Sequence, residues 1–102
     1  MQTYTLSEEA KTDLIEIAQY TLNRWGKKQF NQYKDGLKNK FEAIANKTAQ
    51  QKPFSTKLPE VSVSKYKYHY IFSIQHKNKP LIIAIIHEKR DILRHLENRL
   101  NR

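Results

Sequence analysis

A single glycine, Gly26, separates two long segments whose side chains recur with the period of an α-helix. In the first segment the recurring side chains are Ala10, Leu14, Ile17, Ala18, Thr21, Leu22 and Trp25. In the second segment, from Lys27, they are Phe30, Tyr33, Leu37, Phe41, Ile44 and Ala45. Because so short a connection leaves the second helix beside the first, the pattern predicts an antiparallel helical hairpin.

The residues before the first helix predict how it begins. Thr3 to Ser7 alternates β-forming residues, which is typical of a short strand. Ser7 supplies a hydroxyl suited to a helix N-cap, and Glu8 and Glu9 follow where a helix N-terminus favours negative charge. Gly36 lies inside the second helix, where glycine costs about 1 kcal/mol. Its presence indicates either close packing or a tolerated cost.

The segment after the hairpin lacks a clear period. "TAQQKPFSTKLP", from Thr48 to Pro59, contains two prolines and few apolar residues, and we expect a loop. "VSVSKYKYHYIFSIQ" then alternates, which predicts one long strand. Its apolar face would carry Tyr66, Tyr68, Tyr70, Phe72 and Ile74. Its polar face would carry Lys65, Lys67, His69, Ser73 and Gln75.

Two further elements follow the turn "HKNK". "PLIIAIIH" is apolar on both faces, which predicts a central strand covered on both sides. From Asp91 to Leu100 the apolar residues have helical spacing and predict a short helix with Asp91 as its N-cap. His87, Asp91 and His95 recur every four residues, as metal ligands would on one continuous helix. Because His87 belongs to the predicted strand and Asp91 to the cap, we expect no metal site.

Composition limits the class of protein. We expect one α+β domain over residues 1–102, with two or three antiparallel strands and no internal repeat or linker. Cysteine is absent, which excludes disulfides and thiolate zinc sites, and the longest apolar run, Leu81 to Ile86, is too short to span a bilayer. These features predict a soluble cytoplasmic protein. The formal charge of +9 favours nucleic acid, a nucleoprotein machine or an acidic protein as partner, although such an excess also serves solubility alone.

The segment "QYTLNRWGKKQFNQYKDGLKNKFEAIA" resembles the helical hairpin of the ParE branch of the ParE/RelE toxin superfamily. The matching positions are Tyr20, Trp25, Gly26, Gln29, Tyr33, Leu37, Phe41 and Ile44, with Pro53 following the hairpin. A second block, "YHYIFSI" followed by "IIAIIHEKRDILRHL", is similar to the terminal strands of that family, with matches at His87, Asp91, His95 and Leu96. The resemblance implies the RelE/ParE-like fold: an N-terminal strand, a helical hairpin packed on a small antiparallel sheet, and a short C-terminal helix.

The same resemblance implies a function. A ParE-like chain is the toxin of a type II toxin–antitoxin system, inhibits DNA gyrase, and is neutralised by a cognate, acidic ParD-like antitoxin. Such a toxin needs no catalytic residue and no cofactor, so we expect sites that bind proteins. For the target we expect His87, Lys89, Arg90 and Arg94, where the last strand ends. For the antitoxin we expect apolar residues left exposed on the hairpin, namely Tyr20, Leu22 and Trp25, which would otherwise fill the core.

Two other functions fit parts of the sequence. A RelE-like ribosome-dependent mRNA endonuclease needs a base and cations around the phosphate. The groups available for that chemistry are His69, His87, Lys65 and Lys67. An autonomous nucleic-acid-binding module would use the lysines and aromatic residues interleaved in "SKYKYHYIF". The regular alternation of this stretch predicts that its tyrosines face a helix, which would remove them from stacking.

Overall fold

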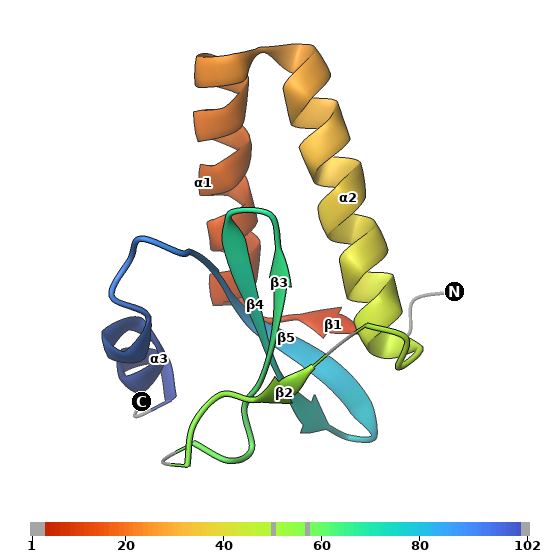
Figure 1. Cartoon of the computed structure of the whole chain (residues 1–102), viewed down its shortest axis with the longest axis vertical. Helices are drawn as coiled ribbons and strands as arrows, with labels where there is room; N and C mark the ends of the chain where they lie inside the picture. The colour runs from red at the N-terminus through yellow and green to blue at the C-terminus, as the bar shows by residue number, and fades with distance from the viewer. Residues whose placement is uncertain (1–3, 50, 57, 101–102) are drawn as a thin grey trace.

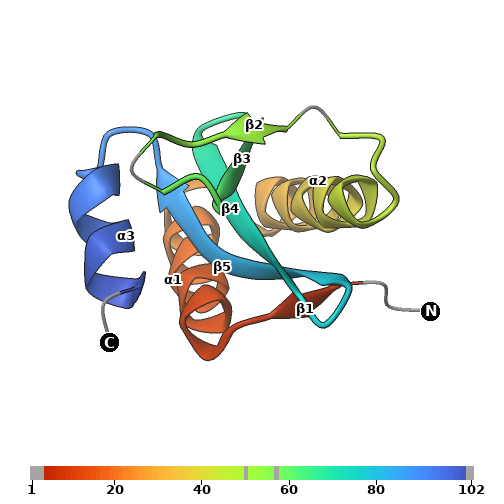
Figure 2. The same ribbon diagram turned by 90° about the horizontal axis from the view of Figure 1, so that it is seen from below.

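The computed structural model describes residues 4–49, 51–56 and 58–100, and these parts contain three helices and five strands. The elements are β1 (Thr5–Leu6), α1 (Glu8–Trp25), α2 (Lys27–Ala45), β2 (Lys52–Pro53), β3 (Ser62–Tyr66), β4 (His69–His76), β5 (Lys79–His87) and α3 (Ile92–Leu100). The strands form one sheet in the order β1-β5-β4-β3-β2, with α1 and α2 on one face and α3 on the other (Figure 1, Figure 2). The predicted α+β class is confirmed, as are the helical hairpin and the C-terminal helix.

The expected local signals define the ends of the helices. Ser7 Oγ accepts the backbone N–H of Ala10 at 3.0 Å and caps α1. Gly26 has a φ of 89°, a conformation that favours glycine, and it alone joins α1 to α2, which run side by side in opposite directions (Figure 1). Asp91 Oδ1 accepts the N–H of Arg94 at 3.4 Å and caps α3. The caps were therefore readable from the sequence.

The sheet is mixed, because β1 pairs in parallel with β5 while the other neighbours are antiparallel. β1 is shorter than the predicted strand, whose first residue, Thr3, lies outside the described residues. The loop expected from Thr48 to Pro59 was wrong for Lys52 and Pro53, which form β2 and pair with β3. Pro53 is accommodated because β2 is an edge strand, where proline is tolerated.

The one long strand predicted from Val61 to Gln75 was also wrong, because a turn divides it. Lys67 and Tyr68 form a two-residue turn closed by the pair Tyr66 and His69. Paired residues of two strands share a face of the sheet, so Tyr66 and His69 lie on one face although they are three positions apart. The turn therefore shifts the alternation by one position, and both predicted faces change composition.

Each predicted face is in fact split between the two sides of the sheet. Of the expected apolar face, Tyr66 packs toward the hairpin, Tyr70, Phe72 and Ile74 pack toward α3, and Tyr68 is exposed.

The expected polar face is split in the same way. Ser73 is buried and donates to Gln51 Oε1 at 3.2 Å, while His69 lies against Tyr33 of α2. Lys65, Lys67 and Gln75 are exposed. The polar face predicted for one strand therefore does not exist as a continuous surface.

The core has two layers, one on each side of β5. Ile82 and Ile85 belong to the layer under α1 and α2, whereas Ile83, Ala84 and Ile86 belong to the layer under α3. Ile83 has no partner on β4, because Phe72 pairs with Ala84 and Ser73 pairs with Ile82. This bulge and the coverage of both faces explain the continuous apolar run of β5.

Gly36 lies at a point of close packing between α2 and β3. Of the two interpretations of this glycine, close packing or a tolerated cost, the first is therefore correct. A Cβ at this position would overlap the Tyr66 phenol ring, which packs at 5.0 Å from the ring of Tyr33. Glycine therefore lets the end of β3 approach the middle of α2.

Candidate functional site

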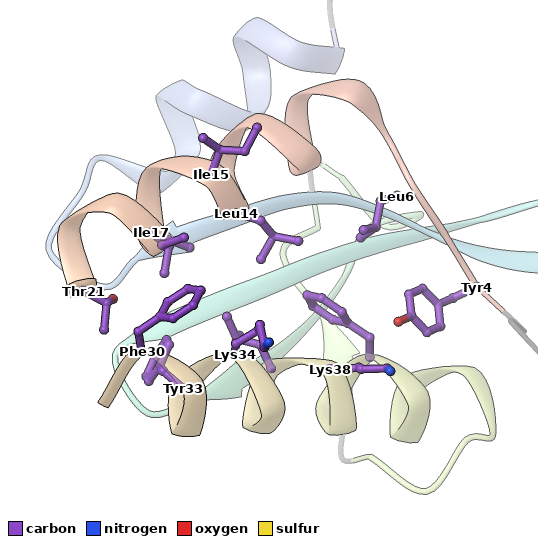
Figure 3. Close-up of a pocket in the computed structure, with 13 residues that line it drawn as sticks. Tyr4, Leu6, Leu14, Ile15, Ile17, Thr21, Phe30, Tyr33, Lys34 and Lys38 are labelled. Atoms are coloured by element: carbon purple, nitrogen blue, oxygen red, sulfur yellow. The ribbon is translucent and has the colours of Figure 1, made fainter. Parts of the chain in front are cut away.

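A groove of about 330 Å³ lies between α1 and α2. Leu14 and Ile17 of α1 and Phe30 of α2 point into the space between the helices, and Tyr4 and Leu6 close one end (Figure 3). Most of its lining is apolar, but Lys34 and Lys38 of α2 also border it. A surface of this kind suits an amphipathic segment whose apolar side enters the groove and whose acidic side faces the lysines.

Two of the three residues expected to bind the antitoxin extend this groove toward the tip of the hairpin. Leu22 and Trp25 follow Ile15 and Ala18 by seven residues each, which is about two helical turns. Ile15 and Ala18 line the groove, so Leu22 and Trp25 lie on the same side of α1, beyond the lining residues. Leu22 is 45% exposed and Trp25 is 61% exposed. Neither residue fills the core.

Tyr20 lies on another side of α1. It follows Asp13 by seven residues, and Asp13 contacts β5 rather than the groove. Tyr20 is 63% exposed, so it is also absent from the core. The structure therefore separates Tyr20 from Leu22 and Trp25.

The turn between β3 and β4 contacts the segment after β5. Tyr68 O accepts the N–H of Glu88 at 2.9 Å, and Lys65 Nζ lies 2.8 Å from Glu88 Oε1. The hydrogen bond between these side chains raises the pKa of Lys65 and lowers the pKa of Glu88. Lys89 and Arg90, two of the residues expected to bind the target, follow at once and are exposed.

His87, the last residue of β5, accepts hydrogen bonds from the backbone of the segment that follows the strand. Its Nδ1 accepts the N–H of Lys89 at 3.1 Å and its carbonyl accepts the N–H of Arg90 at 2.9 Å. Because Nδ1 is an acceptor, the ring proton of the neutral imidazole is on Nε2. Arg94, the fourth expected target residue, is exposed on the first turn of α3.

His69 is half-buried between His87 and Tyr33. Its Nδ1 lies 2.6 Å from Tyr33 Oη, and Tyr33 donates its hydroxyl proton to Tyr66 O at 3.2 Å. The short contact is satisfied when His69 Nδ1–H donates to Tyr33. Burial, with a smaller effect of His87, lowers the pKa of His69 to about 4, and burial raises the pKa of Tyr33 to about 12. Both side chains are therefore neutral at pH 7.

The four groups considered for ribonuclease chemistry do not converge. His69 and His87 are in contact, with ring centroids 5.2 Å apart. Lys65 is paired with Glu88, and Lys67 extends over the Tyr66 ring at 5.7 Å. The contacts recorded for the two lysines therefore do not direct them to the imidazoles.

Neither a metal site nor a membrane span is found in the described part of the chain. No three His, Cys, Asp or Glu side chains among the described residues are grouped to hold a metal ion, including His87, Asp91 and His95. No helix within the described residues combines the length and apolar character needed to cross a bilayer.

Sequence reasoning missed an ion pair that links α1, β5 and α3. Arg99 donates to both carboxylate oxygens of Asp13 at 2.7 and 2.8 Å, and also to Ile83 O at 2.9 Å. Asp13 accepts the N–H of Ile85 at 2.9 Å. Since β1 pairs only with Leu81 and Ile82, the two side chains satisfy the strand edge that β1 leaves open. The hydrogen bonds that Arg99 donates to Asp13 raise the pKa of Arg99.

Comparison with known proteins assigns the family. A family model described as the ParE toxin of type II toxin–antitoxin system, parDE, matches residues 4–92. The Toxin ParE of Escherichia coli is 32% identical over 101 residues, which cover 98% of each chain. A solved structure of the chromosomal ParDE TA system from P. aeruginosa covers 85% of this chain and 96% of that chain, with a TM-score of 0.71; at 12% identity it supports the fold alone. The chain therefore belongs to the ParE toxin family of type II toxin–antitoxin systems, which implies an antitoxin as its partner.

Proposed function

We propose that this ParE-type toxin inhibits DNA gyrase in the cytoplasm and that an acidic, ParD-like antitoxin neutralises it. The target would bind the segment from His87 to Arg90 together with Arg94, and the antitoxin would bind the groove between α1 and α2. The observation that supports this target-binding surface is the group of exposed cations after β5, whose backbone is held by hydrogen bonds. The activity is inhibition by binding, with no bond broken in the target.

The target surface has the charge that such an interaction needs. Lys89 and Arg90 are exposed, and the adjacent carboxylate of Glu88 is already paired with Lys65. Their positive charge is therefore available to an acidic protein, for which complementary charge speeds encounter. The two hydrogen bonds to His87 hold the backbone of this segment, so that less order is lost when a partner binds.

The antitoxin surface combines apolar burial with charge. Leu22 and Trp25 are exposed about two helical turns beyond Ile15 and Ala18. Ile15 and Ala18 line an apolar groove that Lys34 and Lys38 border. A disordered acidic segment that folds into this groove would bury apolar side chains and pair its carboxylates with the lysines. Trp25 is our candidate for the largest single contribution, because exposed tryptophans are enriched among binding hot spots.

Growth of a bacterial host tests the target surface. The test variant carries Lys89→Ala, Arg90→Ala and Arg94→Ala. The control variant removes the same charge elsewhere and carries Lys27→Ala, Lys28→Ala and Lys79→Ala. We expect the wild type and the control to arrest growth and the test variant to permit it. Arrest by all three chains would refute the target surface. Cleaved messenger RNA in the arrested cells would instead support a RelE-like endonuclease.

Co-expression with the cognate antitoxin tests the groove separately. We expect the double variant Leu22→Ser and Trp25→Ser to remain toxic and to resist neutralisation, because both residues are exposed and lie apart from the target segment. Tyr20→Ser is the matched control, since Tyr20 is equally exposed but lies on another side of α1. Full neutralisation of the double variant would show that the antitoxin binds elsewhere.

A further inference from the structure

Tyr68 differs from the neighbouring tyrosines of the sheet. Tyr66 packs against Tyr33, with ring centroids 5.0 Å apart, and Tyr70 packs against Phe72 at 6.3 Å. Tyr68 is 60% exposed in the turn between β3 and β4. Its carbonyl accepts the Glu88 N–H, which fixes the turn against the segment after β5. The expectation that these tyrosines face a helix therefore fails for Tyr68, whose ring is available for stacking.

Lys67, the other residue of this turn, has an unfavourable backbone conformation. Its φ is 50°, in the left-handed region, where glycine and asparagine are the favoured residues of a two-residue turn. Lys47 and Lys77 also have a positive φ, of 64° and 53°, so this conformation alone does not assign a function to Lys67. The Lys67 ammonium lies 5.7 Å from the centroid of the Tyr66 ring, and because the residue is exposed this group can also contact an anion.

The surroundings of Tyr68 carry an excess of positive charge. Residues 65–69 and 87–94 contain five Lys and Arg side chains and two carboxylates. Both carboxylates are already engaged, because Glu88 pairs with Lys65 and Asp91 caps α3. Lys89 and Arg90 are exposed, and neither has an ion-pair partner in the described part of the chain. Four cations therefore remain for an anionic ligand, and Lys67, Lys89 and Arg90 lie in the turn or directly after β5, whereas Arg94 lies on α3.

We propose that this surface binds single-stranded nucleic acid. A base stacks on Tyr68, and Lys67, Lys89 and Arg90 contact neighbouring phosphates. The bases of a duplex are already stacked on one another and offer no face to Tyr68, so a single strand fits better. DNA and RNA share this chemistry. The site goes beyond the proposed inhibition of gyrase, because it needs no protein partner.

Fluorescence anisotropy with the purified full chain tests the site. The probes are labelled single-stranded DNA, single-stranded RNA and duplex DNA, each of about 20 nucleotides. Three phosphate contacts predict a slope of about −2 for the logarithm of the binding constant against the logarithm of salt concentration. A fourfold increase in salt should therefore weaken binding roughly 20-fold. We expect Tyr68→Ala to weaken binding about tenfold and Tyr68→Phe to leave it nearly unchanged.

A matched pair of lysine substitutions separates the site from net charge. Lys77 also has a positive φ, 53°, but it lies in the turn at the other end of β4. Lys67→Asn and Lys77→Asn each remove one charge and relieve one left-handed lysine, so neither should lower the melting temperature. We expect only Lys67→Asn to weaken binding and to reduce the salt slope, by about 0.7.

Three results would overturn the proposal: equal weakening by both lysine substitutions, a duplex bound as tightly as the single strands, or unchanged binding by Tyr68→Ala. Tight binding of either single strand supports it, and comparison of DNA with RNA identifies the ligand. Tyr68 is outside the surface proposed for gyrase. A Tyr68→Ala chain that loses the oligonucleotide but still arrests growth would therefore leave the proposed function intact.

Discussion

Replacement of Asp13 by alanine removes the group that joins α1 to both β5 and α3. The Asp13 side chain is 10% exposed and that of Arg99 is 15% exposed, so the ion pair is largely buried. In the variant, the N–H of Ile85 loses its acceptor and the Arg99 guanidinium loses its counterion. Loss of one partner from a buried pair costs about 3–5 kcal/mol. Because small domains have unfolding free energies of about 5–15 kcal/mol, the variant should lose about a fifth or more of its stability.

Urea denaturation and thermal melting, both followed by circular dichroism, measure this loss. Each kcal/mol shifts the melting temperature of a domain of this size by about 4–8 °C, so we expect Asp13→Ala to melt at least about 12 °C below the wild type. Arg99→Lys should cost about 1 kcal/mol, because lysine keeps the charge but cannot donate in the same fork to Asp13 and Ile83. We also compare the double variant Asp13→Ala and Arg99→Met with the single variants Asp13→Ala and Arg99→Met. The loss of unfolding free energy in the double variant should be about 2 kcal/mol smaller than the sum of the two single losses.

Glu88→Gln is the internal control, because the pair of Glu88 with Lys65 lies at the surface, more exposed than the pair of Asp13 with Arg99, and should contribute little. We expect this substitution to leave the unfolding midpoint nearly unchanged. If Asp13→Ala shifts the midpoint no more than Glu88→Gln does, the pair does not anchor α3 and the strand edge does not depend on it.

Three further predictions concern the hairpin and the end of the sheet. The pKa of His69 is about 4 in the folded chain, below its ordinary 6.5, so the unfolded chain binds the proton more readily. Stability should therefore fall as the pH decreases from 6.5 to 4, by at most about 3 kcal/mol, because solvent screens the half-buried ring. Urea titrations at several pH values test this, and a His69→Gln chain with the same pH dependence would contradict it. Gly36→Ala should lower the unfolding free energy of the wild type, because the added Cβ overlaps Tyr66. In a Tyr66→Ala chain the same substitution should raise the unfolding free energy by up to about 1 kcal/mol, since alanine is the better helix former. A change of the same sign in both chains would refute the role given to Tyr66. Trp25→Ala should change unfolding free energy by no more than about 0.5 kcal/mol but weaken antitoxin binding roughly 30-fold in calorimetry, and a large loss of stability with unchanged affinity would place Trp25 in the core instead.

The elements that were predicted correctly have short-range signals. Ser7, Gly26 and Asp91 each act on residues within a few positions in the chain, so their types alone indicate where a helix begins or ends. The period of α1 and α2 and the apolar run of β5 are also local patterns. These signals were enough to predict the fold class.

The missed features depend on residues that are poor signals or far apart. Lys67 and Tyr68 are not typical turn residues, and the alternation continues through them. The sequence of the hairpin was therefore interpreted as one strand. Asp13 and Arg99 are 86 positions apart, and each alone resembles an ordinary charged residue on a helix. The groove was missed because Leu14 and Phe30 have the same spacing whether two helices close on each other or leave a space between them.

Supercoiling of relaxed plasmid by purified gyrase, with the toxin added at increasing concentration, tests the proposed target most directly. We predict that the wild-type toxin inhibits supercoiling, that prior addition of the cognate antitoxin restores it, and that the variant lacking Lys89, Arg90 and Arg94 inhibits much less. Full supercoiling at every toxin concentration, from a preparation that arrests growth when expressed, would contradict the assignment of gyrase as the target.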